Sequence, residues 1–219
     1  MTSLLAIEQA CEAHVAGITA ADPAHDISHI KRVVNNTRQL TDIEKADAWV
    51  TLPAAWLHDC VQVAKDSPDR ARASTLAAEA AAQFLATLDY PEDKLDAVRH
   101  AVEAHSYSAA IPVRTTEAGI VQDADRLDAL GAIGISRCLL TGGSMGSGLY
   151  NPVDPFCAAR EPADRDWAVD HFYAKLFKLP STMQTRAGRL EAERRVAYMR
   201  GFLDELGREI GVKPPAAGA

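Results

Sequence analysis

Histidine and aspartate side chains recur at three places in this chain where a cation or a paired partner could hold them. His58 and Asp59 are consecutive and end an apolar run, AAWLHD. His29 lies within HDISHIKRV, and Asp125 lies within QDADRLDAL. Such groups beside apolar residues are costly to bury unless they are paired or bind a cation. His58 and Asp59 alone would fit an ordinary helix C-terminus, so the metal hypothesis depends on the whole set.

The segment around Asp125 carries three acidic residues among apolar ones. Asp123, Asp125 and Asp128 lie among isoleucine, valine and leucine residues of a segment that is predicted to form one apolar helix. Three carboxylates in a core are expensive without a cation to neutralise them. This stretch therefore favours a bound metal ion over a purely structural role.

The elements that must position these side chains read as helices. Apolar residues recur at the helical period and no convincing two-residue alternation appears, which predicts an all-α bundle of about seven to eight helices. The predicted helices span residues 3–18, 26–40, 47–60, 71–88, 92–105, 120–141, 167–178 and 182–210. Between them, residues 142–166 are rich in glycine and proline, and a long irregular segment of this kind often forms a lid or a binding element.

Length and composition favour one folded domain. The chain has 219 residues, of which 47% are hydrophobic and 24% charged, so collagen-like, low-complexity and disordered classes are excluded. We expect a single helical domain over residues 1–212, with the metal-site core at about 25–141 and C-terminal helices at 167–210. Residues 213–219 are expected to be a flexible tail.

Charge and cysteine spacing restrict the partners and the compartment. A net charge of −7 opposes binding to nucleic acid or to an anionic membrane. The four cysteines are far apart and form no CxxC motif, which indicates reduced thiols. The N-terminal segment has no basic region typical of a signal peptide, and the longest apolar run has about 10 residues where a bilayer needs roughly 20. These features predict a cytoplasmic protein and leave a homo-oligomer open.

The ordered set of His29, His58, Asp59 and Asp125 resembles the HD-domain superfamily of metal-dependent phosphohydrolases. The similarity extends to HAVEAHSYSA, TTEAGIVQDADRLDALGAIG and DHFYAKLFKLPSTMQT, which resemble the YedJ/YpgQ-like branch. The resemblance covers about residues 25–200 and implies an all-α bundle whose distal aspartate joins the other ligands on one divalent cation. Asp125 is preferred to Asp123 as this last ligand because it follows alanine in the form AD-R-L.

The resemblance thus implies that His29, His58, Asp59 and Asp125 hold one metal ion. Two imidazoles and two carboxylates carry a charge of about −2, which neutralises a divalent ion. Mixed nitrogen and oxygen ligands suit manganese, iron, cobalt, nickel or zinc better than magnesium. Asp123 becomes a candidate catalytic group that orients water, and Asp128 becomes a candidate substrate-binding residue.

Further candidates surround the implied metal. His100 and His105 lie about 140° apart on an ideal helix, so both cannot bind one ion unless the helix ends between them. They are expected to face the phosphate as hydrogen-bond donors or a general acid, with a second metal or a structural role as the alternatives. Lys65 lies six residues beyond Asp59 and completes the catalytic candidates. The candidate substrate-binding groups are Lys175, Lys178, His25, Asp128 and Arg70, and for the basic ones the alternative is a solvated surface.

These residues predict a metal-dependent phosphohydrolase acting on a small phosphorylated molecule. The favoured substrate is a nucleoside or deoxynucleoside triphosphate, hydrolysed to monophosphate and pyrophosphate by a metal-activated water. The rivals with the same site are another nucleotide phosphomonoesterase or phosphodiesterase and a (p)ppGpp hydrolase. A di-iron oxygenase, which needs two metal ions, and a nucleotide sensor without turnover are the rivals from other classes.

Overall fold

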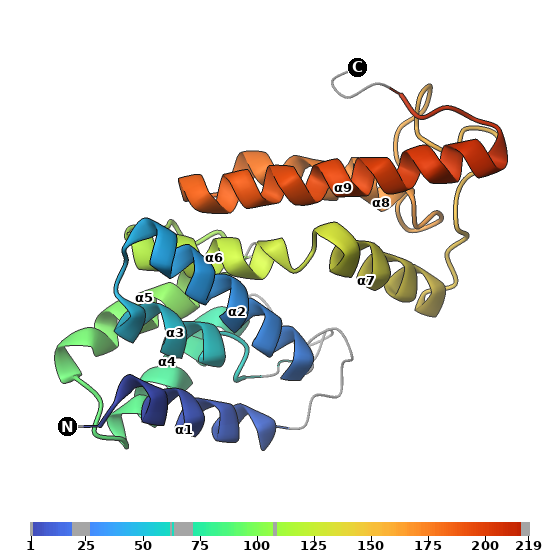
Figure 1. The fold of residues 1–219 in the computed structure, drawn as a ribbon. Helices are drawn as coiled ribbons and strands as arrows, with labels where there is room; N and C mark the ends of the chain where they lie inside the picture. The colour runs from blue at the N-terminus through green and yellow to red at the C-terminus, as the bar shows by residue number, and fades with distance from the viewer. Residues whose placement is uncertain (1, 19–26, 62, 64–71, 107–108, 216–219) are drawn as a thin grey trace. The chain divides into compact units, whose positions relative to one another are not determined.

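A computed structural model describes residues 2–18, 27–61, 63, 72–106 and 109–215 (Figure 1). Within these ranges the chain forms nine α-helices and two short 3₁₀ helices, and its only β-type pairing is an isolated bridge between Gly148 and Trp167. The predicted all-α fold is confirmed, with slightly more helices than expected. None of the described helices is both long enough and apolar enough to cross a bilayer.

The described chain divides into two compact units. The first unit comprises Met1–Asp125 with Gln184–Gly188, and the second comprises Arg126–Met183 with Arg189–Ala219. The single domain expected from the composition stays a prediction. Each unit has its own set of buried side chains.

The first unit is organised around α3. Its helices are α1 (Leu4–Ala16), α2 (Ile27–Glu44), α3 (Ala48–Leu57), α4 (Ala73–Ala86), α5 (Leu95–Ala104) after a 3₁₀ turn at Glu92–Lys94, and α6 (Thr116–Leu127), whose last two residues belong to the second unit. The sequence of α3, AWVTLPAAWL, is apolar on every side, so it must be covered all round. It packs against α1, α2 and α5, and α4 packs against α5 (Figure 1).

Pro53 lies inside α3 without disrupting it. Proline has no N–H, so the carbonyl four residues earlier, that of Trp49, lacks its helical donor. The hydroxyl of Tyr90 donates to this carbonyl instead. At the start of the helix, Asp47 accepts a hydrogen bond from the Trp49 N–H at 2.9 Å and forms the N-cap. The helix therefore runs intact to Leu57 and delivers His58 and Asp59 at its end.

The second unit contains α7 (Gly131–Ser144), α8 (Asp170–Ala174), a 3₁₀ helix (Leu176–Thr182) and most of α9 (Arg186–Ile210). The predicted single helix over residues 120–141 is wrong, because α6 ends at Leu127 and α7 begins at Gly131. Leu130 is extended and Gly131 has a φ of 71°, a conformation that breaks an α-helix and favours glycine. The helix predicted over 167–178 is likewise shorter and continues as the 3₁₀ helix.

The irregular segment between α7 and α8 is held by two aspartates. Asp170, at the start of α8, is fully buried and accepts hydrogen bonds from the guanidinium of Arg160 and, at 2.7 Å, from the N–H of Ala163. Asp154 accepts from the N–H groups of Ala158 and Ala159 at 2.9 and 2.8 Å. The segment thus has a defined backbone fixed by charge-assisted hydrogen bonds.

Candidate metal centre

Four side chains from three parts of the first unit converge at one point. His29 comes from the first turn of α2, His58 and Asp59 directly follow α3, and Asp125 comes from the end of α6. The Nε2 atom of His29 lies 3.5 Å from Oδ1 of Asp125, and Nε2 of His58 lies 3.5 Å from Oδ2 of Asp59. His29, His58 and Asp125 each offer a ligand atom within 4.8 Å of the others. The spacing suits a shared cation.

The ring of His58 is oriented so that Nε2 faces the carboxylates. Its Nδ1 lies 2.8 Å from the carbonyl oxygen of Ala55 and donates to it, which leaves Nε2 as an acceptor. This Nε2 is buried and has no hydrogen-bond partner among the described residues. Burial lowers the pKa of His58, although the charges of Asp59 and Asp125 oppose the shift. A neutral imidazole whose buried acceptor nitrogen receives no hydrogen bond is the form that binds a metal ion.

His105 lies beside this cluster. His105 is the C-cap of α5, which ends at Ala104, and its backbone is still helical, so it points to a different side from His100. Its Nδ1 lies 2.6 Å from the carbonyl oxygen of Val102, and its Nε2 lies 3.6 Å from Oδ1 of Asp59. Burial alone would lower the pKa of His105, but the contact with Asp59 and the charge of that carboxylate raise it overall. His105 therefore faces the oxygen of Asp59 that does not face His58.

The ring of His100 contacts residues other than the predicted metal ligands. Its Nδ1 lies 2.9 Å from Oε1 of Glu103, and the backbone N–H of Arg114 donates to its Nε2 at 3.1 Å. Both ring nitrogens thus have protein partners. Among the described residues, a second candidate ligand group consists of His58, Asp59 and His105, and His100 belongs neither to it nor to the group given above. The structure brings His105, and not His100, next to the predicted ligands.

Asp123 and Asp125 face different surroundings. The buried carboxylate of Asp123 accepts hydrogen bonds at 2.8 Å from the N–H of Gln184 and from both the N–H and the hydroxyl of Thr185. A Cβ atom at Gly188 would lie 2.3 Å from Oδ2 of Asp123, so this contact requires glycine there. Asp123 thus holds the chain before α9, and Asp125 is the aspartate beside His29.

Two buried amides fix the helices that carry the candidate ligands. The side chain of Asn36, two turns after His29 on α2, donates to the carbonyl of Ala124 at 3.2 Å. The side chain of Gln122 donates to the carbonyl of Ala104, next to His105, at 2.6 Å. Ala124 is in the last turn of α6, where carbonyls lack helical donors. Local sequence pattern gives no signal for either contact, because each joins residues that are distant in the chain.

The other predicted site residues belong to the second unit or fall outside the described ranges. His25, Lys65 and Arg70 are outside the residues that the structure describes. Asp128 belongs to the second unit, where it is buried and pairs with Arg137 at 2.6 Å. Lys175 and Lys178 are both exposed residues of the second unit.

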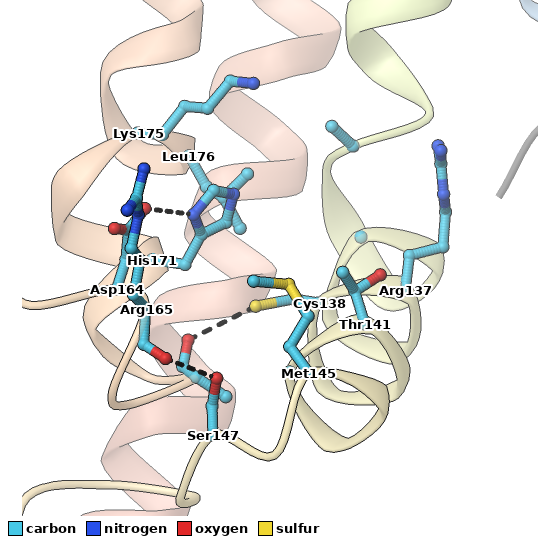
Figure 2. A pocket seen from close by; sticks show the side chains of 14 residues that line it. Arg137, Cys138, Thr141, Met145, Ser147, Asp164, Arg165, His171, Lys175 and Leu176 are labelled. Atoms are coloured by element: carbon cyan, nitrogen blue, oxygen red, sulfur yellow. Dashed lines mark hydrogen bonds and ion pairs between the residues drawn. The ribbon is translucent and has the colours of Figure 1, made fainter. Parts of the chain in front are cut away.

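The second unit contains a pocket of about 550 Å³, and Lys175 lines it (Figure 2). Helix α7 forms one wall, and residues 164–168 with α8 form the opposite side. Figure 2 shows His171 on this second side, with its Nδ1 2.9 Å from Oδ2 of Asp164. Lys178 is not among the lining residues. The two lysines predicted together therefore have different surroundings.

Comparisons with known proteins are consistent with this arrangement. The family model described as HD domain matches residues 26–130. The uncharacterized protein YpgQ of Bacillus subtilis is 32% identical over 197 residues, which are 88% of this chain and 88% of that protein. An HD-superfamily hydrolase from Bacillus thuringiensis has a TM-score of 0.75 and 32% identity over 97% of this chain and all of that one. The crystal structure of YpgQ in complex with ADP has a TM-score of 0.67 and 29% identity over 94% of each chain.

Proposed function

Since the chain belongs to the HD domain family, we propose that it is a metal-dependent phosphohydrolase that acts on a nucleoside or deoxynucleoside triphosphate. The observation that carries this proposal is the buried Nε2 of His58, which meets no donor from the described residues and faces the carboxylates of Asp59 and Asp125. A cation at this point would satisfy the imidazole and both carboxylates together. Family membership alone would not fix the chemistry, which depends on these side chains.

His29, His58, Asp59 and Asp125 are the residues that would hold the ion. Their two imidazoles and two carboxylates suit one manganese, iron, cobalt, nickel or zinc ion better than magnesium. When bound, the ion supplies a water of lowered pKa and a positive charge that stabilises the phosphoryl oxygens. Nε2 of His105 lies 3.6 Å from Oδ1 of Asp59. The other oxygen, Oδ2, therefore faces His29 and His58.

Several observations support a small nucleotide as the substrate. The solved structure of YpgQ, which is similar over nearly the whole chain, contains ADP. The net charge of −7 disfavours a polymeric phosphate ligand, whereas a small ester can approach one cationic centre. Triphosphate cleavage to monophosphate and pyrophosphate is the reaction that we assign.

A product analysis tests this assignment. The purified chain, supplied with manganese, is incubated with the common nucleoside and deoxynucleoside triphosphates. We expect pyrophosphate and monophosphate without free phosphate, together with about one metal ion per chain. Free phosphate would indicate a phosphomonoesterase instead, and binding without turnover would indicate a sensor. Two ions per chain with oxygen consumption would indicate an oxygenase.

Asn36 should influence metal affinity through the position of Asp125. In Asn36→Leu, the carbonyl of Ala124 loses its side-chain donor and the last turn of α6 is no longer held by α2. We expect the affinity for manganese, measured by competition with a chelating dye, to fall about tenfold.

Thr41→Val is the matched control for this substitution. Thr41 lies on the same helix and donates a buried hydrogen bond at 2.9 Å to Thr51 on α3, away from the ligand-bearing turn. Both variants lose one buried hydrogen bond and should have lower melting temperatures. An equal loss of manganese affinity in the two variants would mean that Asn36 acts only through overall stability.

A further inference from the structure

The pocket of the second unit has lining residues that suit an anionic ligand. All of its lining residues lie between positions 129 and 176, so it is complete within one unit. Its volume of about 550 Å³ is in the usual range for small-molecule sites. We propose that this pocket binds a nucleoside phosphate without a metal ion, with the phosphate held by Lys175 and Arg137. The choice of a nucleoside phosphate, though not the pocket's preference for an anion, rests on the function proposed above.

The local charge of the pocket is opposite in sign to that of the chain. Arg137, Arg165 and Lys175 are its cationic lining residues, and Asp164 is its one acidic lining residue. Asp164 is already paired with His171, and Arg137 is paired with Asp128. In a chain of net charge −7, such a concentration of cationic groups attracts an anion to this place.

Cationic side chains stand on both sides of the pocket. Figure 2 shows Arg137 on α7 on one side of the pocket and Lys175, beyond α8, on the opposite side. Arg137 is held in place because its guanidinium donates to the carboxylate of Asp128 at 2.6 Å and to its backbone carbonyl at 3.2 Å. A guanidinium, which carries five N–H donors, and an ammonium on the facing side both bind phosphate oxygens well. A held side chain also loses less entropy on binding.

The remaining lining suits an uncharged ligand body with a few polar groups. Cys138, Met145 and Leu176 supply apolar and polarisable surface, and Thr141 supplies a hydroxyl. The contact between Nδ1 of His171 and Asp164 fixes the ring, so that Nε2 is the nitrogen left for a ligand. Apolar walls with a few placed polar groups are typical of sites for small organic molecules.

Binding of deoxyadenosine monophosphate to the full chain in excess EDTA, measured by calorimetry, tests the proposal. Wild type and Asp125→Ala should bind equally, because the pocket contains none of the candidate metal ligands. Lys175→Ala should bind about tenfold more weakly, since it removes one charged donor to the phosphate. Lys178→Ala is the matched control, because Lys178 is also exposed, lies three residues away and does not line the pocket.

Several results of these binding measurements would contradict the proposal. Equal weakening in Lys175→Ala and Lys178→Ala would show general attraction to a basic surface and would overturn the proposal. Loss of binding in Asp125→Ala, or no binding by wild type, would also overturn it. If the protein takes up metal and hydrolyses triphosphates but does not bind the monophosphate in EDTA, only the proposal for the pocket is refuted. One that binds the monophosphate in EDTA but neither takes up metal nor turns over substrate would refute only the proposed function.

Discussion

Asp125→Ala is expected to remove the bound metal ion and the hydrolytic activity while the helical fold remains. Asp125 provides the carboxylate nearest to Nε2 of His29, and its side chain is 30% exposed, so little packing is lost with it. The donor set would fall from a charge of about −2 to about −1, which no longer neutralises a divalent ion. Metal content after dialysis and helical circular dichroism measure the two parts of this result.

Asp123→Asn is the informative control for this substitution. The amide would keep the shape of the carboxylate that it replaces, but one of the two acceptor atoms becomes a donor and then faces the N–H of either residue 184 or residue 185. We expect a lower melting temperature and nearly normal metal content. Retained metal in Asp125→Ala together with metal loss in Asp123→Asn would show that the other aspartate is the ligand.

Asp170→Ala should cause the largest loss of stability in the second unit. The substitution leaves the guanidinium of Arg160 without its carboxylate, and the N–H of Ala163 without its acceptor, around a fully buried position. Breaking a buried ion pair by removing one partner costs about 3 kcal/mol or more. Chemical denaturation followed by circular dichroism measures the change, with exposed Asp166→Ala as the matched control. A similar free energy of unfolding in the two variants would mean that the Asp170 ion pair is energetically unimportant.

The same ion pair should make stability depend on pH. Burial alone would raise the pKa of Asp170, but the hydrogen bonds from Arg160 and Ala163 and the charge of Arg160 outweigh it and hold the pKa below its usual value. A carboxyl group with a lowered pKa stabilises the fold above its unfolded-state pKa and loses that contribution in acid. The stability advantage of wild type over Asp170→Ala should therefore be constant near neutrality and shrink below about pH 4.

The sequence was most informative where residue type and order determine the chemistry. His58 and Asp59 follow an all-apolar helix, and this helix has to be central because no side of it can face water. The position of Asp125 was harder to predict, because residues two apart on a helix point about 160° away from each other. Helical periodicity therefore indicates that Asp123 and Asp125 face opposite sides, but it does not say which side carries His29.

The features that the sequence did not reveal depend on contacts between distant segments. The apolar pattern continues through LDALGAIG, so periodicity favoured one helix where Gly131 separates α6 from α7. Lys175 and Lys178 share a helical spacing, yet only Lys175 lines the pocket. Lys175 lies between α8 and the 3₁₀ helix with a non-helical φ of −136°, so the α-helix on which that spacing was based does not include both residues. The partnership of Asn36 with Ala124 joins residues 88 positions apart, and local pattern carries no information about it.

The contact between Tyr90 and the Trp49 carbonyl links position 90 to the proline at position 53, and we expect the two positions to change together in evolution. Proline at 53 requires a hydroxyl at 90, because phenylalanine there would leave a carbonyl of α3 without its donor. A residue with an N–H at 53 would satisfy that carbonyl from within the helix and would free position 90 to lose its hydroxyl. Substitutions at the two positions should therefore be correlated across lineages, even though neither residue is a candidate ligand or lines the pocket.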